Sequence, residues 1–303
     1  MSQIVVRQAT VADAPGILSA SRAAFGARPI LGAAPAALQD SVADLETRLE
    51  RGTALVAAEG SKLVGGLFFE DSGSDSAYMS RVHVHPGFQG QGIARALIET
   101  AIQAAAIEGF RTLELDVSSE YPEHLDSWRR YGFMQIRRNE QLIRLRRDLP
   151  VVVEVPTAAD MQNLGRKLAK LLRPGDLLVL DGELGAGKTT LTQGIGAGMR
   201  VDGAIISPTF VLSRIHPPLE AGPALVHVDA YRLASAAEVF DIDIADTLAE
   251  SITVIEWGRG LAEQLSDSRL EVTIDRADDT RVVYLGAVGP AWNDRDLTVL
   301  ESE

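Results

Sequence analysis

A complete phosphate-loop pattern, G-x-x-x-x-G-K-[ST], is formed by Gly182-Glu183-Leu184-Gly185-Ala186-Gly187-Lys188-Thr189. The preceding Asp176-Leu177-Leu178-Val179-Leu180-Asp181 reads as the buried strand that leads into this loop. A strand, loop and helix of this kind is typical of an α/β fold in which a nucleotide lies at the carboxyl ends of the strands. The sequence therefore predicts that this part of the chain binds a nucleoside triphosphate.

The residue types in the loop match the chemistry of a triphosphate. Glycines allow backbone N–H groups to curl around a β-phosphate, and Lys188 can neutralise β- and γ-phosphate oxygens. The Thr189 hydroxyl, at the start of a helix, can ligate Mg²⁺. An ordinary glycine-rich turn before a helix would leave Lys188 and Thr189 together without an explanation.

Mg²⁺ needs a second anchor, which is usually a carboxylate at the end of an apolar strand. Two such strands follow the loop, and they are Leu225-Val226-His227-Val228-Asp229 and Ile252-Thr253-Val254-Ile255-Glu256. Either acid alone is compatible with a solvated strand end. The residues by themselves do not rank Asp229 against Glu256 as the metal anchor.

Four motifs in this half resemble those of the TsaE (YjeE) family, the ATPases of bacterial tRNA threonylcarbamoyladenosine synthesis. They are G-E-L-G-A-G-K-T-T at 182–190, S-P-T-F at 207–210, H-V-D-A-Y-R at 227–232 and E-W at 256–257. The resemblance covers about residues 151–290. It implies that ATP is bound by Gly182, Glu183, Leu184, Gly185, Ala186, Gly187, Lys188, Thr189 and Thr190. It also implies that Glu256 joins Thr189 on Mg²⁺, while Lys188, Asp229 and Thr209 belong to the catalytic and switch region.

The charge of the chain is uneven. Residues 1–150 carry 16 Lys plus Arg against 18 Asp plus Glu, a net charge of −2, whereas residues 151–303 carry 13 against 24, a net charge of −11. Because affinity for nucleic acid comes mostly from Lys and Arg, we expect the second half to meet tRNA only indirectly and to bind no DNA. The family resemblance implies docking on the TsaB and TsaD subunits of the threonylcarbamoyl transferase. Acidity that merely keeps the protein in solution is an equal explanation for most of these charges.

The first half contains a second glycine-rich turn. Val82-His83-Val84-His85-Pro86 alternates like a strand, and Gly87-Phe88-Gln89-Gly90-Gln91-Gly92-Ile93-Ala94 leads into a helix with apolar periodicity. Consecutive N–H groups at the positive end of a helix suit a pyrophosphate. His83 and His85 could in principle share a metal, although strand residues beside a cofactor are the simpler interpretation.

The pattern Gln89-x-x-Gly92-x-Ala94 resembles the acetyl-CoA loop [QR]-x-x-G-x-[GA] of the GNAT family of N-acetyltransferases. Leu63-Val64-Gly65-Gly66, Tyr131-Gly132-Phe133 and the opening segment 5–13 agree with it, and the resemblance spans about residues 3–147. It implies that acetyl-CoA is bound by Val82, Val84, Gln89, Gly90, Gln91, Gly92, Ile93 and Ala94.

One position departs from the GNAT pattern F-Y-x-x-x-G-F, whose Tyr acts as a general acid. Trp128 stands there, and an indole has no proton with a useful pKa. Tyr121, Tyr131 or a water could replace the acid, or the domain could bind acetyl-CoA without fast turnover. The acceptor pocket is expected in the variable loops 25–38 and 120–128.

A length of 303 residues fits two domains, 1–149 and 150–303, with the boundary near Pro150. For the first we expect a GNAT-type mixed α/β sheet, with strands at 3–7, 53–59, 62–70, 77–85, 111–117 and 133–145 and helices at 11–25, 38–50, 91–108 and 122–131. For the second we expect a phosphate-loop α/β domain, with an extended segment at 151–155, helices at 158–172 and 188–199, and strands at 209–215, 224–229, 252–256, 268–274 and 281–287.

The chain has no cysteine, no charged-then-apolar leader and no apolar run approaching 18 residues, which predicts a cytoplasmic protein without a membrane partner. The interpretation that we carry forward is an acetyltransferase-like domain fused to a TsaE-type ATPase, with ATP, Mg²⁺ and acetyl-CoA as cofactors. Two alternatives remain at this point. One is a regulatory protein that senses acetyl-CoA or nucleotide, and the other is a small-molecule kinase in the second half.

Overall fold

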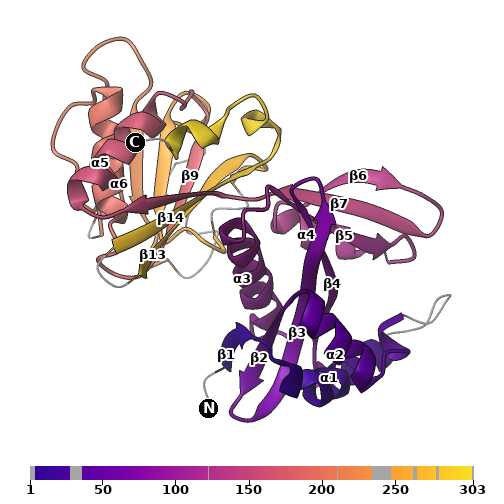
Figure 1. The fold of residues 1–303 in the computed structure, drawn as a ribbon. Coiled ribbons are helices and arrows are strands. Elements are labelled where there is room, and N and C mark those ends of the chain that lie inside the picture. Colours follow the sequence, from indigo (N-terminus) through magenta and orange to yellow (C-terminus); the bar gives the residue numbers. More distant parts are fainter. Residues whose placement is uncertain are drawn as a thin grey trace. The chain divides into compact units, whose positions relative to one another are not determined.

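The computed structural model describes residues 4–27, 36–121, 123–209, 211–233, 247–261, 265–277 and 280–301. The chain forms two compact units, Met1–Leu149 and Pro150–Glu303 (Figure 1). Most of the expected acceptor loop 25–38 and the motif residue Phe210 lie outside the described residues. In the described part of the chain, no helix is long and apolar enough to cross a membrane.

The first unit is built on a seven-stranded sheet with the order β1-β2-β3-β4-β5-β7-β6. Neighbouring strands are antiparallel except for β4 and β5, which are parallel, so the sheet is mixed as expected. The strands are β1 Ile4–Gln8, β2 Thr53–Glu59, β3 Lys62–Gly73, β4 Ser76–Val84, β5 Thr112–Ser118, β6 Met134–Arg138 and β7 Leu142–Asp148. The helices are α1 Ala14–Gly26, α2 Val42–Arg51, α3 Ile93–Ile107 and α4 Glu123–Arg130.

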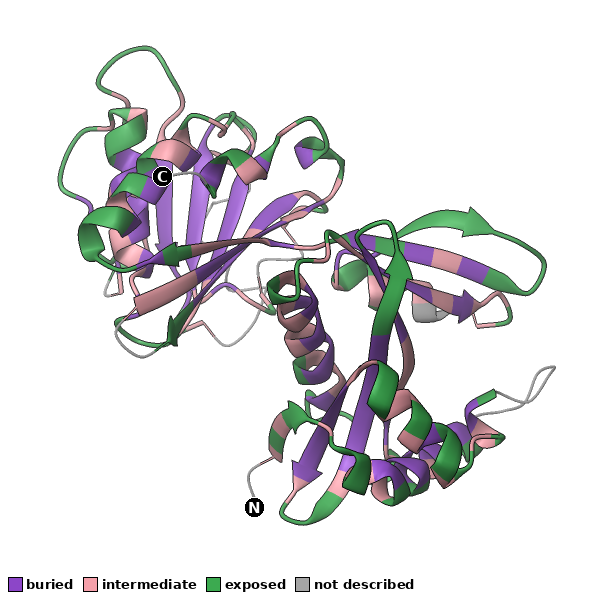
Figure 2. Cartoon of the chain, in the orientation of Figure 1, coloured by how far each residue is buried: buried purple, intermediate pink, exposed green. Residues whose placement is uncertain are grey.

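Apolar periodicity decides which helix face is buried. In α3, Leu97, Ala101 and Ala105 are completely buried, and they pack with Leu113 of β5 in the main core of this unit. A second cluster joins α1 and α2 to β2 and β3. The central strands are accordingly buried while the outer faces of the helices are exposed (Figure 2).

The strand predicted at 133–145 is wrong as a single element. The structure has a hairpin instead, because Oδ1 of Asn139 accepts hydrogen bonds from the backbone N–H groups of Gln141 and Leu142 and so stabilises a turn. Asn commonly bonds the backbone two residues ahead in this way. The chain therefore reverses, and β6 becomes an edge strand that pairs with β7.

The second unit has a seven-stranded sheet with the order β10-β11-β12-β9-β13-β14-β8. The four central strands, β11, β12, β9 and β13, are parallel, and the outer pairings are antiparallel. The strands are β8 Val151–Val155, β9 Leu177–Asp181, β10 Ser213–His216, β11 Leu225–Asp229, β12 Ile252–Glu256, β13 Arg269–Ala277 and β14 Thr280–Val288, and the helices are α5 Ala158–Ala169 and α6 Lys188–Met199.

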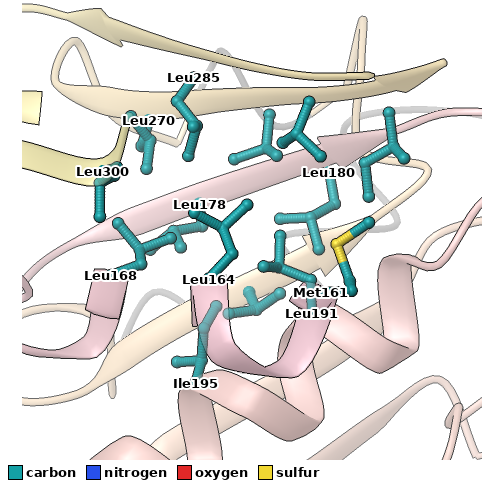
Figure 3. Close-up of a cluster of buried hydrophobic side chains, with 14 of the residues drawn as sticks. Met161, Leu164, Leu168, Leu178, Leu180, Leu191, Ile195, Leu270, Leu285 and Leu300 are labelled. Atoms are coloured by element: carbon teal, nitrogen blue, oxygen red, sulfur yellow. The ribbon is translucent and has the colours of Figure 1, made fainter. Parts of the chain in front are cut away.

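Helices α5 and α6 pack against one face of this sheet (Figure 3). Leu168 of α5 and Leu191 of α6 are completely buried, and they meet Leu178 and Leu180 of β9 in the same cluster. Truncating one such leucine to alanine costs about 2–5 kcal/mol. This packing fixes the start of α6 relative to the end of β9.

Two predicted boundaries in this unit are wrong. The strand predicted at 209–215 begins only at Ser213, because the N–H groups of Val211 and Leu212 donate to Pro208 O in a turn and Leu212 has a φ of +64°. The helix predicted at 158–172 ends at Ala169, since the N–H groups of Lys170 and Leu171 bond three residues back. A turn stabilised locally has overridden the apolar pattern in both places.

Candidate functional sites

The phosphate-loop sequence connects β9 to α6. β9 ends at Asp181, and α6 begins at Lys188 with Gly187 as its N-cap. Gly182 has a φ of +143°, and a Cβ there would lie 2.5 Å from Ile274 O, so only glycine fits. The loop therefore turns tightly from the strand into the helix, whose first N–H groups have no partner within the helix.

Lys188 is folded back onto its own loop. Its Nζ donates to Gly182 O at 2.5 Å and to Glu183 O at 3.0 Å, and it lies 3.7 Å from the centroid of the Trp257 ring. Burial lowers the pKa of the Lys188 ammonium, and the nearby carboxylates of Glu256, Asp181 and Asp229 oppose this effect. The ammonium is thus held at the phosphate loop among backbone oxygens and an aromatic face.

The two candidate acids lie in register on neighbouring parallel strands, Asp229 at the end of β11 and Glu256 at the end of β12. Both are buried. Thr189 Oγ1 donates to Oε1 of Glu256 at 2.8 Å. The structure therefore brings Thr189 to Glu256, two residues that are far apart in the sequence.

Asp229 has a different set of partners. Its Oδ2 accepts hydrogen bonds from Thr209 Oγ1 at 2.5 Å and from Ser207 Oγ at 2.9 Å, and Oδ1 accepts from the N–H of Tyr231 at 3.0 Å. Ser207 and Thr209 also share a hydrogen bond of 2.7 Å. The S-P-T segment is thus tied to Asp229 through its hydroxyl groups. This geometry separates the two acids, which the residues alone could not do.

One buried residue in this site had no predicted role. His227 lies in the middle of β11, and its Nε2 is 2.8 Å from Oε1 of Glu256. A polar residue inside the otherwise apolar strand L-V-H-V-D was a visible signal, because a buried polar group needs a partner. The sequence did not indicate which partner that would be.

The donor set fits Mg²⁺. Thr189 and Glu256 offer hard oxygen ligands, which Mg²⁺ prefers over nitrogen or sulfur. In the described residues, no three His, Cys, Asp or Glu side chains gather as a metal cage. A nucleotide-bound Mg²⁺ does not need a cage, because it takes one or two protein ligands together with phosphate oxygens and water.

The glycine-rich turn of the first unit lies where two parallel strands separate. β4 and β5 pair only from Ser76 to Tyr78 and from Thr112 to Glu114, although β4 continues to Val84. Val82 and Val84 therefore lie on a length of β4 whose edge is not paired with β5. An extended ligand can add to such an edge through backbone hydrogen bonds.

A bulge shapes β4 at this point. Its register against β3 shifts between Ser80 and His83, where Arg81 has a φ of +57°. The Arg81 guanidinium donates two hydrogen bonds, of 2.7 Å and 3.0 Å, to the carboxylate of Asp40. A bulge bends a strand, and this ion pair fixes the bend in place.

The loop from Gln89 to Ala94 ends in α3. Gly92 is the N-cap of α3 with a φ of +77°, and a Cβ there would meet no atom within 4 Å. The side chain of Gln89 points back to the strand, since its Nε2 donates to Val84 O at 3.3 Å. The start of α3, whose first N–H groups have no partner within the helix, thus adjoins the end of β4 that is not paired with β5, as an anion site requires.

The remaining candidates of this unit have other partners. The Trp128 ring packs against Phe133 at 5.4 Å and against Tyr131 at 6.1 Å between centroids, and burial raises the pKa of Tyr131. His83 Nδ1 is 2.7 Å from Arg81 O, and His85 Nδ1 accepts from the N–H of Gly87 at 3.2 Å. His83 thus bonds the backbone of its own strand through Nδ1, and His85 bonds the turn that follows through Nδ1.

Comparison with known proteins assigns both units. The family model of the threonylcarbamoyl adenosine biosynthesis protein TsaE matches residues 155–283, and that of the acetyltransferase (GNAT) family matches residues 27–133. The tRNA threonylcarbamoyladenosine biosynthesis protein TsaE of Streptomyces coelicolor is 53% identical over 146 residues, which are 46% of this chain and 99% of that protein.

Further relatives match each half. The protein of the same name from Mycobacterium tuberculosis H37Rv is 45% identical over 42% of this chain and 82% of its own length. A PaiA N-acetyltransferase from Thermoplasma acidophilum, solved in complex with coenzyme A, is 15% identical over 48% of this chain and 99% of that chain, with a TM-score of 0.43. The chain therefore belongs to the TsaE family, and it carries a GNAT-family acetyltransferase domain fused ahead of the TsaE region.

Proposed function

We propose that the second unit hydrolyses ATP in support of tRNA threonylcarbamoyladenosine synthesis, and that the first unit is an acetyl-CoA-dependent N-acetyltransferase. The observation that carries the first part is the convergence of Lys188, Thr189 and Glu256 at one end of the sheet. The similarity to TsaE proteins supports the assignment of this site to tRNA threonylcarbamoyladenosine synthesis. The unit boundary at Leu149 and Pro150 is our assignment of where one activity ends and the other begins.

Each residue of the ATPase site has a role in this proposal. The backbone N–H groups of 182–190 surround the phosphates, and the Lys188 ammonium moves from its loop carbonyls to the phosphate oxygens. Thr189 and Glu256 hold Mg²⁺, which would offset charge on the phosphates. Asp229 orients the attacking water, and its hydrogen bonds to Ser207 and Thr209 make that segment responsive to the γ-phosphate.

We propose TsaB and TsaD as the partners of this unit, since its net charge of −11 argues against direct contact with tRNA. The cytoplasm, where tRNA is modified, is the proposed location. Purified chain should hydrolyse ATP slowly alone and faster when TsaB and TsaD are added. ATP turnover that ignores both subunits, or that needs a small-molecule phosphate acceptor, would favour a kinase instead.

The observation that supports the acetyltransferase proposal is that β4 and β5 stop pairing before the glycine-rich turn. Val82 and Val84 would pair with the extended arm of acetyl-CoA, and the N–H groups from Gln89 to Ala94 would bind its pyrophosphate. Calorimetry with acetyl-CoA tests the binding. Absence of binding would remove both the enzyme and a sensor of acetyl-CoA.

Turnover in this unit depends on an acid for the leaving thiolate. Because Trp128 stands at the usual position, the proton must come from Tyr121, Tyr131 or a water. Trp128→Tyr should raise the rate of acetyl transfer by placing a hydroxyl there, with Tyr131→Phe as the matched variant. Tight binding without transfer to any of a broad panel of amines and protein N-termini would favour a sensor.

A further inference from the structure

A buried histidine lies behind the proposed metal ligand. His227 is in β11, between β10 and β12, and its side chain is completely buried. Its register partner on the neighbouring strand β12 is Val254, which lies two residues before Glu256. The His227 ring therefore reaches diagonally across to Glu256. The distance from His227 Nε2 to Glu256 Oε1 is 2.8 Å.

The chemistry of the pair sets the direction of this bond. A carboxylate can only accept a hydrogen bond, so Nε2 of His227 carries the hydrogen and donates the hydrogen bond to Glu256. In the part of the chain that the structure describes, His227 Nδ1 is buried without a hydrogen-bond partner. A neutral ring with its proton on Nε2 avoids leaving an N–H donor buried and unpaired at Nδ1.

Both donors to Glu256 end on the same oxygen. Thr189 Oγ1 and His227 Nε2 each lie 2.8 Å from Oε1. These two bonds approach from α6 on one side and from β11 on the other, which restricts the rotation of the carboxylate. Among the described residues, both of these hydrogen bonds end on Oε1, which leaves the second oxygen, Oε2, for a metal or its water.

We propose that His227 is a positioning residue for the Mg²⁺ site, fixing the Glu256 carboxylate before nucleotide and metal arrive. This inference rests on the proposed role of Glu256. Partners that orient a metal ligand in this way typically change metal affinity by about 10- to 100-fold when they are removed. The alternative is a histidine that merely fills the core, in which case its loss would alter stability and leave the metal dependence unchanged.

The test compares three forms of the full chain: wild type, His227→Leu and His227→Gln. ADP binding is measured by calorimetry over a series of Mg²⁺ concentrations and also in EDTA. Mg²⁺ raises the affinity for ADP, and His227→Leu should need at least about 10-fold more Mg²⁺ than wild type to reach half of that increase. The ADP affinity measured in EDTA should be nearly the same in both proteins. His227→Gln should recover most of the loss, because its amide nitrogen can donate from nearly the same place as Nε2.

His216→Leu is the matched control. His216 is a buried histidine of β10 in the same unit, and its Nδ1 lies 3.2 Å from the backbone oxygen of Asp202, so it has a hydrogen-bond partner other than Glu256. Its loss should lower the melting temperature without moving the Mg²⁺ dependence. If His227→Leu behaves like this control, the positioning role is overturned and the core role is supported.

Three further outcomes are informative. If His227→Leu does not give a folded chain, His227→Asn replaces it, since this shorter amide cannot reach Glu256. A wild-type Mg²⁺ dependence in the His227→Asn variant would overturn the proposal. If Glu256→Gln itself leaves the Mg²⁺ dependence unchanged, the proposed metal ligand is wrong and the inference falls with it. A shift for Glu256→Gln but none for His227→Leu overturns the positioning role alone.

Discussion

The ammonium of Lys188 lies over the Trp257 ring, 3.7 Å from its centroid, while it also donates to two loop carbonyls. A phosphate can reach this ammonium only if those contacts loosen. We therefore expect the fluorescence of Trp257 to change when ATP or ADP binds, because a cation leaves its face. Nucleotide titrations of wild type and of Trp257→Phe, followed by tryptophan fluorescence, measure this change. A change that persists in the variant would come from another tryptophan and contradict the prediction.

Replacing Lys188 should separate function from stability. Lys188→Met is expected to lower partner-stimulated ATP hydrolysis by at least about 100-fold, the size typical of losing one pre-organised charge-stabilising donor. The melting temperature should change little, because the burial that lowers the pKa of Lys188 opposes folding while its contacts with two loop carbonyls and the Trp257 ring favour it. Hydrolysis assays and thermal melts check both; an unchanged rate would refute the phosphate-loop assignment.

The two acids should fail in different ways. Glu256→Gln should weaken the dependence of nucleotide binding on Mg²⁺, since it removes the charge that accompanies Thr189. Asp229→Asn should lower turnover with a smaller effect on nucleotide affinity, because its partners are Ser207 and Thr209. Mg²⁺ titrations that single out Asp229 would show that the roles are exchanged.

Acetyl-CoA binding should depend on Gly92. A valine at a φ of +77° is strained, and its side chain would stand at the N-terminus of α3 where the pyrophosphate is expected. Gly92→Val should abolish the calorimetric signal. Gly73→Val is the matched control, because Gly73 has a φ of +85° on the turn between β3 and β4, where a Cβ would also meet no atom within 4 Å. Equal loss in both variants would point to misfolding instead.

The acid stability of the first unit should depend on Asp13. Hydrogen bonds from the Arg7 guanidinium hold the pKa of Asp13 well below its usual value of about 3.9. A depressed carboxyl pKa stabilises the fold above the unfolded pKa, and that contribution is lost as the pH falls through the folded pKa. Asp13→Asn should thus have a lower melting temperature than wild type at pH 7, and the difference between the two melting temperatures should shrink below pH about 4. Calorimetric melts over this pH range check this, and a difference that does not change with pH would contradict it.

Prediction from sequence succeeded where covalent spacing dictates the geometry. The loop before Lys188 has a fixed length between a buried strand and a helix, so both element bounds followed from the pattern. The fused α/β architecture and its two families are confirmed by the family models. Periodicity also located α3, because its apolar positions repeat every three to four residues.

Prediction failed where a locally hydrogen-bonded turn competes with the strand pattern. Asn139 closes a turn inside a run that otherwise alternates like one strand, and Pro208 accepts bonds that delay the start of β10. The residue pattern alone could not rank Asp229 against Glu256 because both end similar strands, and their separate roles came only from the family resemblance. The structure distinguishes the two acids by their partners, which are the S-P-T hydroxyls for Asp229 and Thr189 with His227 for Glu256.

The passage from β7 to β8 leaves only Leu149 and Pro150 between two strands. The N–H of Leu149 is bonded to Arg111 O, and Pro150 is buried, so neither residue offers a protease an extended, accessible stretch. A cell that makes this chain therefore makes its two units in equal numbers, and the passage between them gives a protease no extended stretch at which to separate them. Synthesis of the chain cannot raise the amount of one unit without the other, which leaves ligands and partners as means of controlling them separately.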